Sequence, residues 1–167
     1  MINLEGVKPF AEGGNRVCYI HPDKKGLCLK ISKTDVIKTM RQKAPWYKQL
    51  RPEKSFDDNF REEKAYKQRA IKENPNKIWR HLAKWHGFVD TSKGMASCTE
   101  LITSNGKVAK NLGQYLFSSG KTPEIEQAIK EFEAYLLKTR LLTKNIIPHN
   151  LAVKDMETNL SLKIVDG

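Results

Sequence analysis

Four side chains of this sequence have the types that hold the phosphates of a nucleotide. Lys30 lies in the apolar run "CLKI", and Glu62 lies in "REEKAY". Asn150 precedes the apolar triplet Leu151-Ala152-Val153, and Asp166 follows the next apolar run. A lysine ammonium contacts phosphate oxygens, a carboxylate orients that lysine, and amide and carboxylate oxygens are ligands for Mg²⁺. The set predicts binding of nucleotide phosphates together with Mg²⁺.

Lys30 and the glutamates also have plainer interpretations. Lys30 in isolation is typical of a lysine at the edge of a strand, whose ammonium stays in water. Glu63 is an alternative partner for Lys30, and either glutamate alone is typical of a helix surface. Glu62 is favoured because Tyr66 lies four residues later, where protein kinases have an apolar residue on the same helix face.

In order and rough spacing these residues resemble the protein-kinase fold along nearly the whole chain. The sequence resembles more closely the YrbL-like family (the PhoP regulatory network protein family), a bacterial, degenerate kinase-like group. The segments that carry this resemblance are "GGNRVCYIHPD", "CLKI", "REEKAY", "WHGFVDT" and "PHNLAV…IVDG". The resemblance implies a cytoplasmic bacterial protein with a protein partner in a two-component regulatory network. It also implies a chain that continues somewhat past Gly167.

The catalytic loop of kinases, H-R-D-L-x-x-x-N, can be aligned with Asn150 at its last position. Thr143, Lys144 and Asn145 then stand at the places of the His, Arg and catalytic Asp. An amide cannot accept the proton of a substrate hydroxyl as a carboxylate does. Asp166 falls at the metal-binding Asp of D-F-G, although a glycine follows it directly. The resemblance therefore implies a pseudokinase-like protein that binds ATP and Mg²⁺ with weak or absent phosphotransfer.

The glycine-rich loop and the adenine-binding hinge are matched less closely. Gly13 keeps one of the three glycine positions of the kinase loop, Arg16 occupies another, and Gly14 adds a further glycine. Backbone amides at Gly13 and Gly14 can approach phosphate, and Arg16 can add charge. An ordinary hairpin turn is the alternative. The segment Thr99-Glu100-Leu101-Ile102 resembles the hinge at which adenine hydrogen-bonds to backbone, with Glu100 and Ile102 as the expected contacts.

Charge is the strongest signal in the composition. The 167 residues contain 30 Lys and Arg against 19 Asp and Glu, a net charge of +11. Residues 21–90 hold 18 of the basic and 9 of the acidic residues, which is +9. A basic face attracts phosphate-rich partners such as nucleotides, nucleic acid or an anionic membrane surface, but it can equally be a solvated surface.

The length of the apolar runs, the N-terminal segment and the cysteine spacing argue against several classes of protein. No window approaches 18 consecutive apolar residues, so a membrane span is not expected. The start "MINLEGVKPF" lacks the build of a signal peptide. The three cysteines have no metal-ligand spacing. We expect a cytoplasmic protein with reduced thiols.

The elements that must position these residues follow from periodicity and turn signals. Expected strands cover residues 7–10, 17–20, 27–31, 82–91, 95–102 and the two arms of a hairpin at 151–166. Expected helices cover 35–43, 59–70 (capped by Asn59), 108–117 and 122–142 (capped by Thr122), with a linker at 103–107. This order indicates an α+β, protein-kinase-like two-lobe fold with an antiparallel N-terminal sheet and a reduced helical C-lobe. Residues 1–102 would form the N-lobe, with a basic insertion at 33–58, and residues 103–167 the reduced C-lobe.

Two function hypotheses remain beside the pseudokinase. One is an active atypical small-molecule or protein kinase that recruits another base, since phosphoryl transfer depends mostly on positioning and charge. The other is a basic module for nucleic acid or an acidic partner on a kinase-like scaffold. Trp46, Trp79 and Trp85 lie among basic residues, and we expect packing for them rather than base stacking. The four histidines show no metal spacing and are expected at the surface or in turns.

Overall fold

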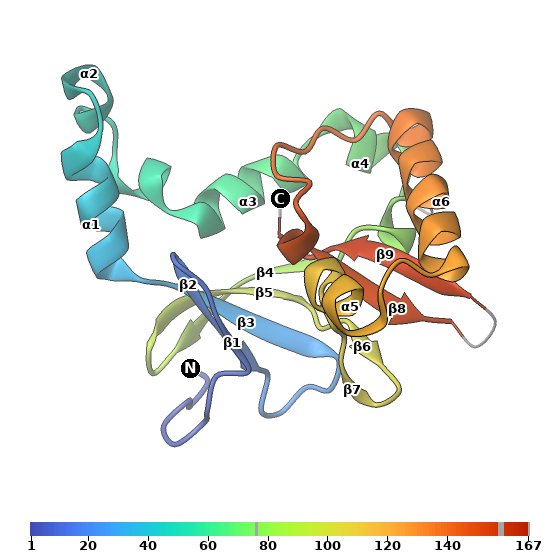
Figure 1. The fold of residues 1–167 in the computed structure, drawn as a ribbon. Coiled ribbons are helices and arrows are strands. Elements are labelled where there is room, and N and C mark those ends of the chain that lie inside the picture. The colour runs from blue at the N-terminus through green and yellow to red at the C-terminus, as the bar shows by residue number, and fades with distance from the viewer. Residues whose placement is uncertain (76, 157–158, 167) are drawn as a thin grey trace. The chain divides into compact units, whose positions relative to one another are not determined.

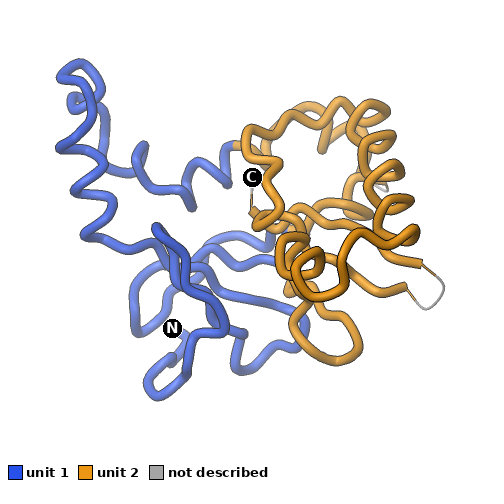
Figure 2. The backbone as a smooth tube through the Cα atoms, in the orientation of Figure 1, with its two compact units in different colours: residues 1–64, 85–100 blue, residues 65–84, 101–167 orange. Residues whose placement is uncertain are grey.

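The computed structural model describes residues 1–75, 77–156 and 159–166 and divides into two compact units (Figure 2). Unit 1 comprises Met1–Lys64 and Trp85–Glu100, and unit 2 comprises Ala65–Lys84 and Leu101–Gly167. The chain passes between them after residues 64, 84 and 100. Residues 65–84, which the sequence placed in the first half, therefore cluster with the second unit. The protein is α+β, with an antiparallel sheet and several helices.

Unit 1 is built on an antiparallel sheet with the strand order β1-β2-β3-β5-β4 (Figure 1). The strands are β1 (Ala11–Glu12), β2 (Arg16–Ile20), β3 (Leu27–Ser32), β4 (Trp85–Thr91) and β5 (Gly94–Glu100). Leu4, Tyr19, Leu29, Ala96 and Cys98 form the buried core of the unit. The expected strands at 17–20 and 27–31 pair antiparallel as β2 and β3, and those at 82–91 and 95–102 pair antiparallel as β4 and β5.

The first strand lies later in the chain than the sequence predicted. Residues 7–10 are not a strand, although Phe10 N donates a single hydrogen bond to Cys18 O. Pro9 has no N–H to contribute to a ladder, which is why regular pairing begins only at Ala11, opposite Cys18.

The helix expected at 59–70 is two helices, α3 (Asp58–Tyr66) and α4 (Arg69–Glu73). Gln68, with ψ of 149°, is extended and separates them. The expected cap was also wrong, because Asn59 lies inside α3 and is buried. Asp57 Oδ1 accepts from Asn59 N at 2.8 Å and so takes the capping role.

The basic insertion forms α1 (Thr34–Lys43), α2 (Trp46–Gln49) and the 3₁₀ turn η1 (Glu53–Phe56). The short helix expected at 35–43 is confirmed. None of the three elements contains a buried residue.

The three tryptophans behave differently. Trp79 stacks on Tyr66 with ring centroids 6.4 Å apart. Trp85 meets Phe88 edge-on and donates to Ser97 Oγ at 3.0 Å. Packing is therefore confirmed for these two. It was wrong for Trp46, which is 76% exposed because the insertion has no core to receive it.

Unit 2 packs helices against a two-stranded hairpin. Its helices are α4, α5 (Leu112–Ser119) and α6 (Pro123–Thr139), with the 3₁₀ turns η2 (Ile78–Arg80) and η3 (Pro148–Asn150), and the hairpin against which they pack is β8 (Leu151–Asp155) with β9 (Leu160–Ile164). The core comprises Ile71, Ile78, Leu82, Leu112, Ile125, Ala128, Phe132, Tyr135, Leu141, Leu151, Val153, Leu162 and Ile164. The cap by Thr122 is confirmed, since its Oγ1 accepts from Ile125 N. The helix stops earlier than expected, at a left-handed Arg140.

The segment expected to be a linker after β5 is a small hairpin, β6 (Thr103–Ser104) with β7 (Lys107–Val108). Asn105 and Gly106 have φ of 51° and 74°. Positive φ at both central residues is the geometry that Asn-Gly supplies in a two-residue hairpin turn. The Asn105-Gly106 dipeptide was the signal for this hairpin in the sequence.

His81 corrects the expectation that the histidines lie at the surface or in turns. It is 2% exposed, its ring packs on Phe132 and Tyr135, and its Nδ1 lies 2.7 Å from Leu162 O. A carbonyl oxygen only accepts, so Nδ1 carries the proton. Burial lowers the pKa of His81, and the bond to Leu162 opposes that shift only in part. His21, also buried, accepts from the turn amides of Asp23 and Lys24, as a turn histidine should.

In the described part of the chain, no helix has both the length and the apolarity to cross a membrane.

Candidate functional site

The predicted ion pair between Lys30 and Glu62 is confirmed. Lys30 Nζ on β3 lies 2.8 Å from Glu62 Oε1 on α3. The two residues are 5% and 4% exposed. Burying such an ion pair costs desolvation free energy, which is offset only if the geometry is good and the remaining hydrogen-bonding atoms are satisfied. It fixes the face that α3 presents to the sheet.

Arg16 completes this pair in a way that the sequence analysis did not foresee. Its Nη1 lies 2.5 Å from Glu62 Oε2 and 3.2 Å from Asn59 Oδ1, and the residue is buried. Each oxygen of the Glu62 carboxylate therefore meets a different cation. The sequence placed Arg16 at an open phosphate-binding loop, whereas its guanidinium is directed at α3.

The strand register contains the signal for this arrangement. Cys18 on β2 stands opposite Lys30 on β3, and such cross-strand neighbours point to the same face of a sheet. Arg16, two residues from Cys18, shares that face because side chains alternate along a strand. Register cannot be read from the sequence with this accuracy, and so the arginine was assigned to the turn.

Asn59 was mistaken for a helix cap but ties α3 to the sheet. Its Nδ2 donates to Lys30 O at 2.9 Å, while its Oδ1 accepts from Arg16. Asn59 precedes Glu62 by three residues, so both side chains lie on one helix face. That i, i+3 spacing was the signal available in the sequence. We call Arg16, Lys30, Asn59 and Glu62 the buried polar cluster.

The first turn of α3 has two further polar anchors. Ser32 Oγ donates to Asp57 Oδ1 at 2.5 Å, and Asn15 Nδ2 donates to Asp58 Oδ2 at 2.7 Å. Asn15 belongs to the turn between β1 and β2, and Ser32 is the last residue of β3. The glycine turn and the Lys30 strand are thus both bonded to the start of α3.

The glycine turn itself is exposed and open. Gly13 N donates to Arg16 O at 2.9 Å. A Cβ added at Gly14 would meet nothing within 4 Å, and neither Gly13 nor Gly14 has a positive φ. The turn therefore does not need glycine for its backbone angles. Close approach of another group to this backbone remains a reason for glycine here.

Unit 2 brings Asn150 and Asp166 to one end of the β8–β9 hairpin. Leu151 pairs with Ile164, and Val165 N donates to Asn150 O at 2.9 Å. Asn150 Nδ2 donates to Asn145 O at 3.1 Å, which directs the amide group of Asn150 toward the preceding loop. Its Oδ1 is the atom suited to a cation. Asn145, the predicted base position, is exposed.

The predicted hinge residues lie where the chain passes from unit 1 to unit 2. Glu100 ends β5 opposite Leu27, and Ile102 is the second residue after the chain re-enters unit 2 at Leu101. Ile102 is buried, and its carbonyl oxygen accepts from Ala109 N at 2.9 Å. One acceptor position of this carbonyl is therefore already used within unit 2.

A cavity of about 230 Å³ lies at the other end of the hairpin, where β8 and β9 are joined, and is lined in part by Trp79, Arg80, Glu131 and Lys154. It is separate from Asn150 and Asp166. Among the described residues, no group of three or more His, Cys, Asp or Glu could hold a metal ion. Mg²⁺ needs fewer protein ligands, because it keeps several waters and binds substrate phosphates.

Comparison with known proteins agrees with the resemblance seen in the sequence. Residues 2–167 match the family described as PhoP regulatory network protein YrbL. Two curated relatives, each named "Uncharacterized protein YrbL", come from Escherichia coli (strain K12) and Shigella flexneri. Each is 24% identical over 155 residues, which cover 90% of this chain and 65% of the relative. The chain thus spans slightly less than two thirds of the length of these relatives. It belongs to the family of the PhoP regulatory network protein YrbL.

Proposed function

We propose that this chain is a regulatory protein with a protein-kinase-like two-lobe fold, which binds ATP and Mg²⁺ with weak or absent phosphotransfer. The observation that carries the proposal is the buried Lys30–Glu62 pair, 2.8 Å long, between β3 and α3. A strand lysine held by a helix glutamate is the arrangement that positions a lysine for nucleotide phosphates in protein kinases.

The residues of unit 2 are chemically suited to magnesium. Asn150 offers an amide oxygen and Asp166 a carboxylate, and both stand at the same end of one hairpin. Hard oxygen ligands of this kind, one or two from protein with the rest from water and phosphate, are what Mg²⁺ selects. When bound, the ion would neutralise phosphate charge.

Weak transfer follows from Asn145. In the alignment with the kinase catalytic loop it stands five residues before Asn150, at the place of the catalytic carboxylate. Its amide nitrogen has no lone pair available for a proton, and its oxygen is a poor base. The residue at this aligned position therefore cannot take the proton of a substrate hydroxyl.

A regulatory role is supported by the family description, which names a PhoP regulatory network. Within such a network the chain would act in the cytoplasm through a protein partner. Nucleotide binding would then report ATP to that partner, and a high rate of phosphate transfer would not be needed.

Thermal melting with ATP and Mg²⁺ tests the proposal. A ligand that binds only the folded state raises the melting temperature, equivalent to about 2.7 kcal/mol at a ligand concentration 100 times Kd. We expect a rise for the wild-type chain that is lost in Lys30→Met and reduced in Asp166→Asn. Lys25→Met and Asp155→Asn, at exposed positions, are the matched controls and should keep the rise.

Two results would count against the proposal. One is a melting temperature that ATP and Mg²⁺ leave unchanged in the wild-type chain. The other is an equal rise in Lys30→Met, with folding of that variant verified by circular dichroism.

A further inference from the structure

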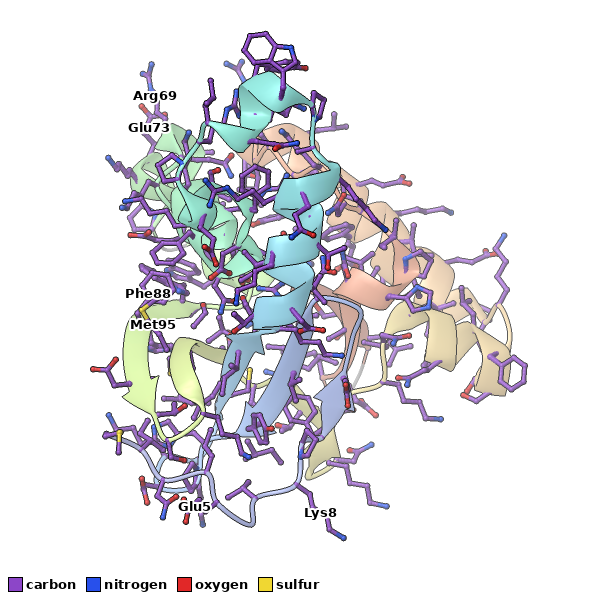
Figure 3. All side chains as sticks on the ribbon, turned by 90° about the vertical axis from the view of Figure 1, so that its left-hand side faces the viewer. Glu5, Lys8, Arg69, Glu73, Phe88 and Met95 are labelled. Atoms are coloured by element: carbon purple, nitrogen blue, oxygen red, sulfur yellow. The ribbon has the colours of Figure 1, made fainter. Side chains whose placement is uncertain are left out.

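The helices α1 and α2 with the turn η1 form a segment that extends from the sheet of unit 1 (Figures 1 and 3). We call residues 34–56 the basic arm. Its three elements contain no buried residue. The shape of the basic arm therefore depends on contacts other than a buried core.

Polar contacts to backbone fix the shape. Arg41 donates to Gln49 O from Nε at 3.3 Å and from Nη2 at 3.2 Å. Gln49 Nε2 donates back to Gln42 O at 3.2 Å and to Ala44 O at 2.7 Å. These reciprocal bonds hold α1 and α2 together without using any large apolar side chain. Preorganisation of this kind lowers the entropic cost of binding.

The apolar side chains of α2 and of Leu50, which follows it directly, face solvent. Trp46 is 76% exposed, Tyr47 53% and Leu50 79%. Trp46 and Leu50 are four residues apart and so share one face of the turn. Exposed aromatic and aliphatic side chains that gather on a fixed element mark interaction surfaces, and Trp and Tyr are enriched among the residues that dominate binding energy.

The charge of the arm is mostly positive, with six Lys and Arg against Asp35 and Glu53 in residues 34–56, and Glu53 lies 4.0 Å from Arg41. Residues 36–52 contain five Lys and Arg (Lys38, Arg41, Lys43, Lys48 and Arg51) and no Asp or Glu. Complementary charge steers a partner and suppresses partners of like charge. The surface therefore combines an apolar centre of three side chains with a cationic surround.

We propose that the basic arm docks an acidic segment of a partner protein, with an apolar side chain of that segment packed on Trp46 and Leu50. The carboxylates of the segment would face Lys43, Lys48 and Arg51. The proposal is independent of nucleotide binding, because the arm contributes none of the buried polar cluster or of the hairpin that holds Asn150 and Asp166.

Single-stranded nucleic acid fits the arm less well. Sequence-tolerant binding relies on open aromatic faces on which bases stack. The Tyr47 ring already has Lys48 Nζ at 6.0 Å from its centroid, and Trp46 meets it at 90° with centroids 6.2 Å apart. Leu50, which is 79% exposed, has no aromatic ring on which a base could stack.

An anionic membrane also fits less well. Stable binding at a bilayer surface requires a longer apolar face or more than one anchor. The apolar residues of α1, namely Val36, Ile37 and Met40, are partly buried and not presented with the tip. Three side chains match the size of the energetic centre of a protein interface.

The test uses fluorescently labelled synthetic peptides of about five helical turns. Three unrelated sequences each carry Glu and Asp on one helix face and Leu and Phe on the other. Matched peptides have Gln for Glu and Asn for Asp. Binding of each peptide to the chain is measured by fluorescence anisotropy. Binding of a labelled 20-nucleotide oligothymidine and of vesicles with anionic lipid is measured separately. We expect the acidic peptides to bind and the neutral ones to bind about tenfold more weakly or not at all.

Variants localise the binding. The double variant Trp46→Ala with Leu50→Ala should lower the affinity for the acidic peptides about tenfold or more. The double variant Lys48→Glu with Arg51→Glu should lower it similarly. Phe117→Ala removes an aromatic side chain that is 96% exposed on α5 and should leave the affinity unchanged. Lys24→Glu with Lys25→Glu is the charge control.

Several outcomes would overturn the proposal. Failure of all three acidic peptides to bind is one, and binding that survives the Trp46/Leu50 double variant is another. Oligothymidine or vesicle binding with the same dependence on these residues would assign the arm to that surface instead. Dimerisation in analytical ultracentrifugation that the double variant abolishes would assign it to a second copy of the chain.

Discussion

Glu62 is the residue at which the polar contacts of unit 1 converge. Its two carboxylate oxygens meet Lys30 and Arg16, and Asn59 joins the arginine to the backbone of β3. A carboxylate held at both oxygens by buried cations has little freedom to rotate. The lysine predicted to contact phosphate is therefore fixed before any ligand arrives, and Arg16 contributes to that by positioning Glu62.

Removing Arg16 should destabilise the fold. Arg16→Met leaves Asn59 Oδ1 and Glu62 Oε2 without the guanidinium, and breaking a buried pair in this way costs about 3 kcal/mol or more. Urea unfolding should report this decrease in the free energy of unfolding. Arg51→Met, in the exposed arm, is the control and should change it by less than about 0.5 kcal/mol. If Arg16→Met lowers the free energy of unfolding by less than about 0.5 kcal/mol, Arg16 is not part of the cluster in solution.

The stability of the chain should fall with acid because of His81. Its pKa in the folded chain lies below 6.5, chiefly because of burial, whereas the unfolded chain titrates near 6.5. Between these values the unfolded state binds more protons, so the free energy of unfolding decreases as pH falls, by up to about 1.4 kcal/mol per pH unit. His21, whose pKa is also lowered by burial, adds in the same direction.

Urea unfolding at several pH values between 7.5 and 5 measures this effect. His81→Gln should flatten the dependence on pH even though it lowers stability overall, whereas His86→Gln, at an exposed position, should leave the dependence unchanged. An unaltered slope in His81→Gln would mean that His81 is protonated equally in both states.

At the scale of elements, the turn between β1 and β2 can be tested independently of stability. A Cβ at Gly14 meets no atom and no positive φ is involved, so Gly14→Ala should leave the melting temperature nearly unchanged. If phosphate approaches this backbone, the same variant should weaken ATP binding, as measured by the ATP-induced rise in melting temperature. Gly26→Ala is the contrasting variant, because φ of +77° strains an alanine and should destabilise by about 1 kcal/mol. An ATP response in Gly14→Ala equal to that of wild type would remove the turn from the proposed site.

Local signals predicted some elements well. The helix α6 has a cap at Thr122, proline at its first position and a regular apolar stripe, and all three depend only on neighbours in sequence. The hairpin β8–β9 and the pairing of Lys30 with Glu62 were likewise predicted. The role of Arg16 depends on strand register, and that of Asn59 on which helix face meets the sheet. These are long-range properties, which residue types alone do not determine.

Other errors have local causes. The hairpin β6–β7 was missed because its strands have only two residues each, too short for a periodic pattern, although Asn105-Gly106 marked the turn. Trp46 was expected to pack because tryptophan is usually buried to a large extent. The insertion that carries it has no core, and composition did not indicate this.

On the scale of the whole molecule, the +11 charge is concentrated in residues 21–90, which include the basic arm. The two proposals divide the molecule between separate tasks. Nucleotide chemistry is assigned to the buried polar cluster and to the end of the β8–β9 hairpin. Partner recognition is assigned to the arm, whose shape depends on neither.

Restoring a carboxylate tests whether the degenerate base limits activity. Asn145→Asp should raise ATP hydrolysis or autophosphorylation within the range of about 10²–10⁴-fold that general-base catalysis contributes, with little change in ATP affinity. Asn159→Asp, at the other end of the hairpin, adds the same charge and should have no effect. The assay should include a chain of the full length of the curated relatives. Rapid phosphotransfer by the unmodified protein would contradict the assignment of Asn145.

Calorimetric titration of the chain with ATP, in Mg²⁺ and again in EDTA, tests the central claim most directly. We predict saturable binding of one ATP per chain in Mg²⁺ and at least about tenfold weaker binding in EDTA, because the ion neutralises phosphate charge that Lys30 alone cannot. In Asp166→Asn, most of the difference between the ATP affinity in Mg²⁺ and that in EDTA should disappear. Absence of ATP binding in both would contradict the account, and binding that is equal in Mg²⁺ and EDTA would contradict the magnesium role of Asn150 and Asp166.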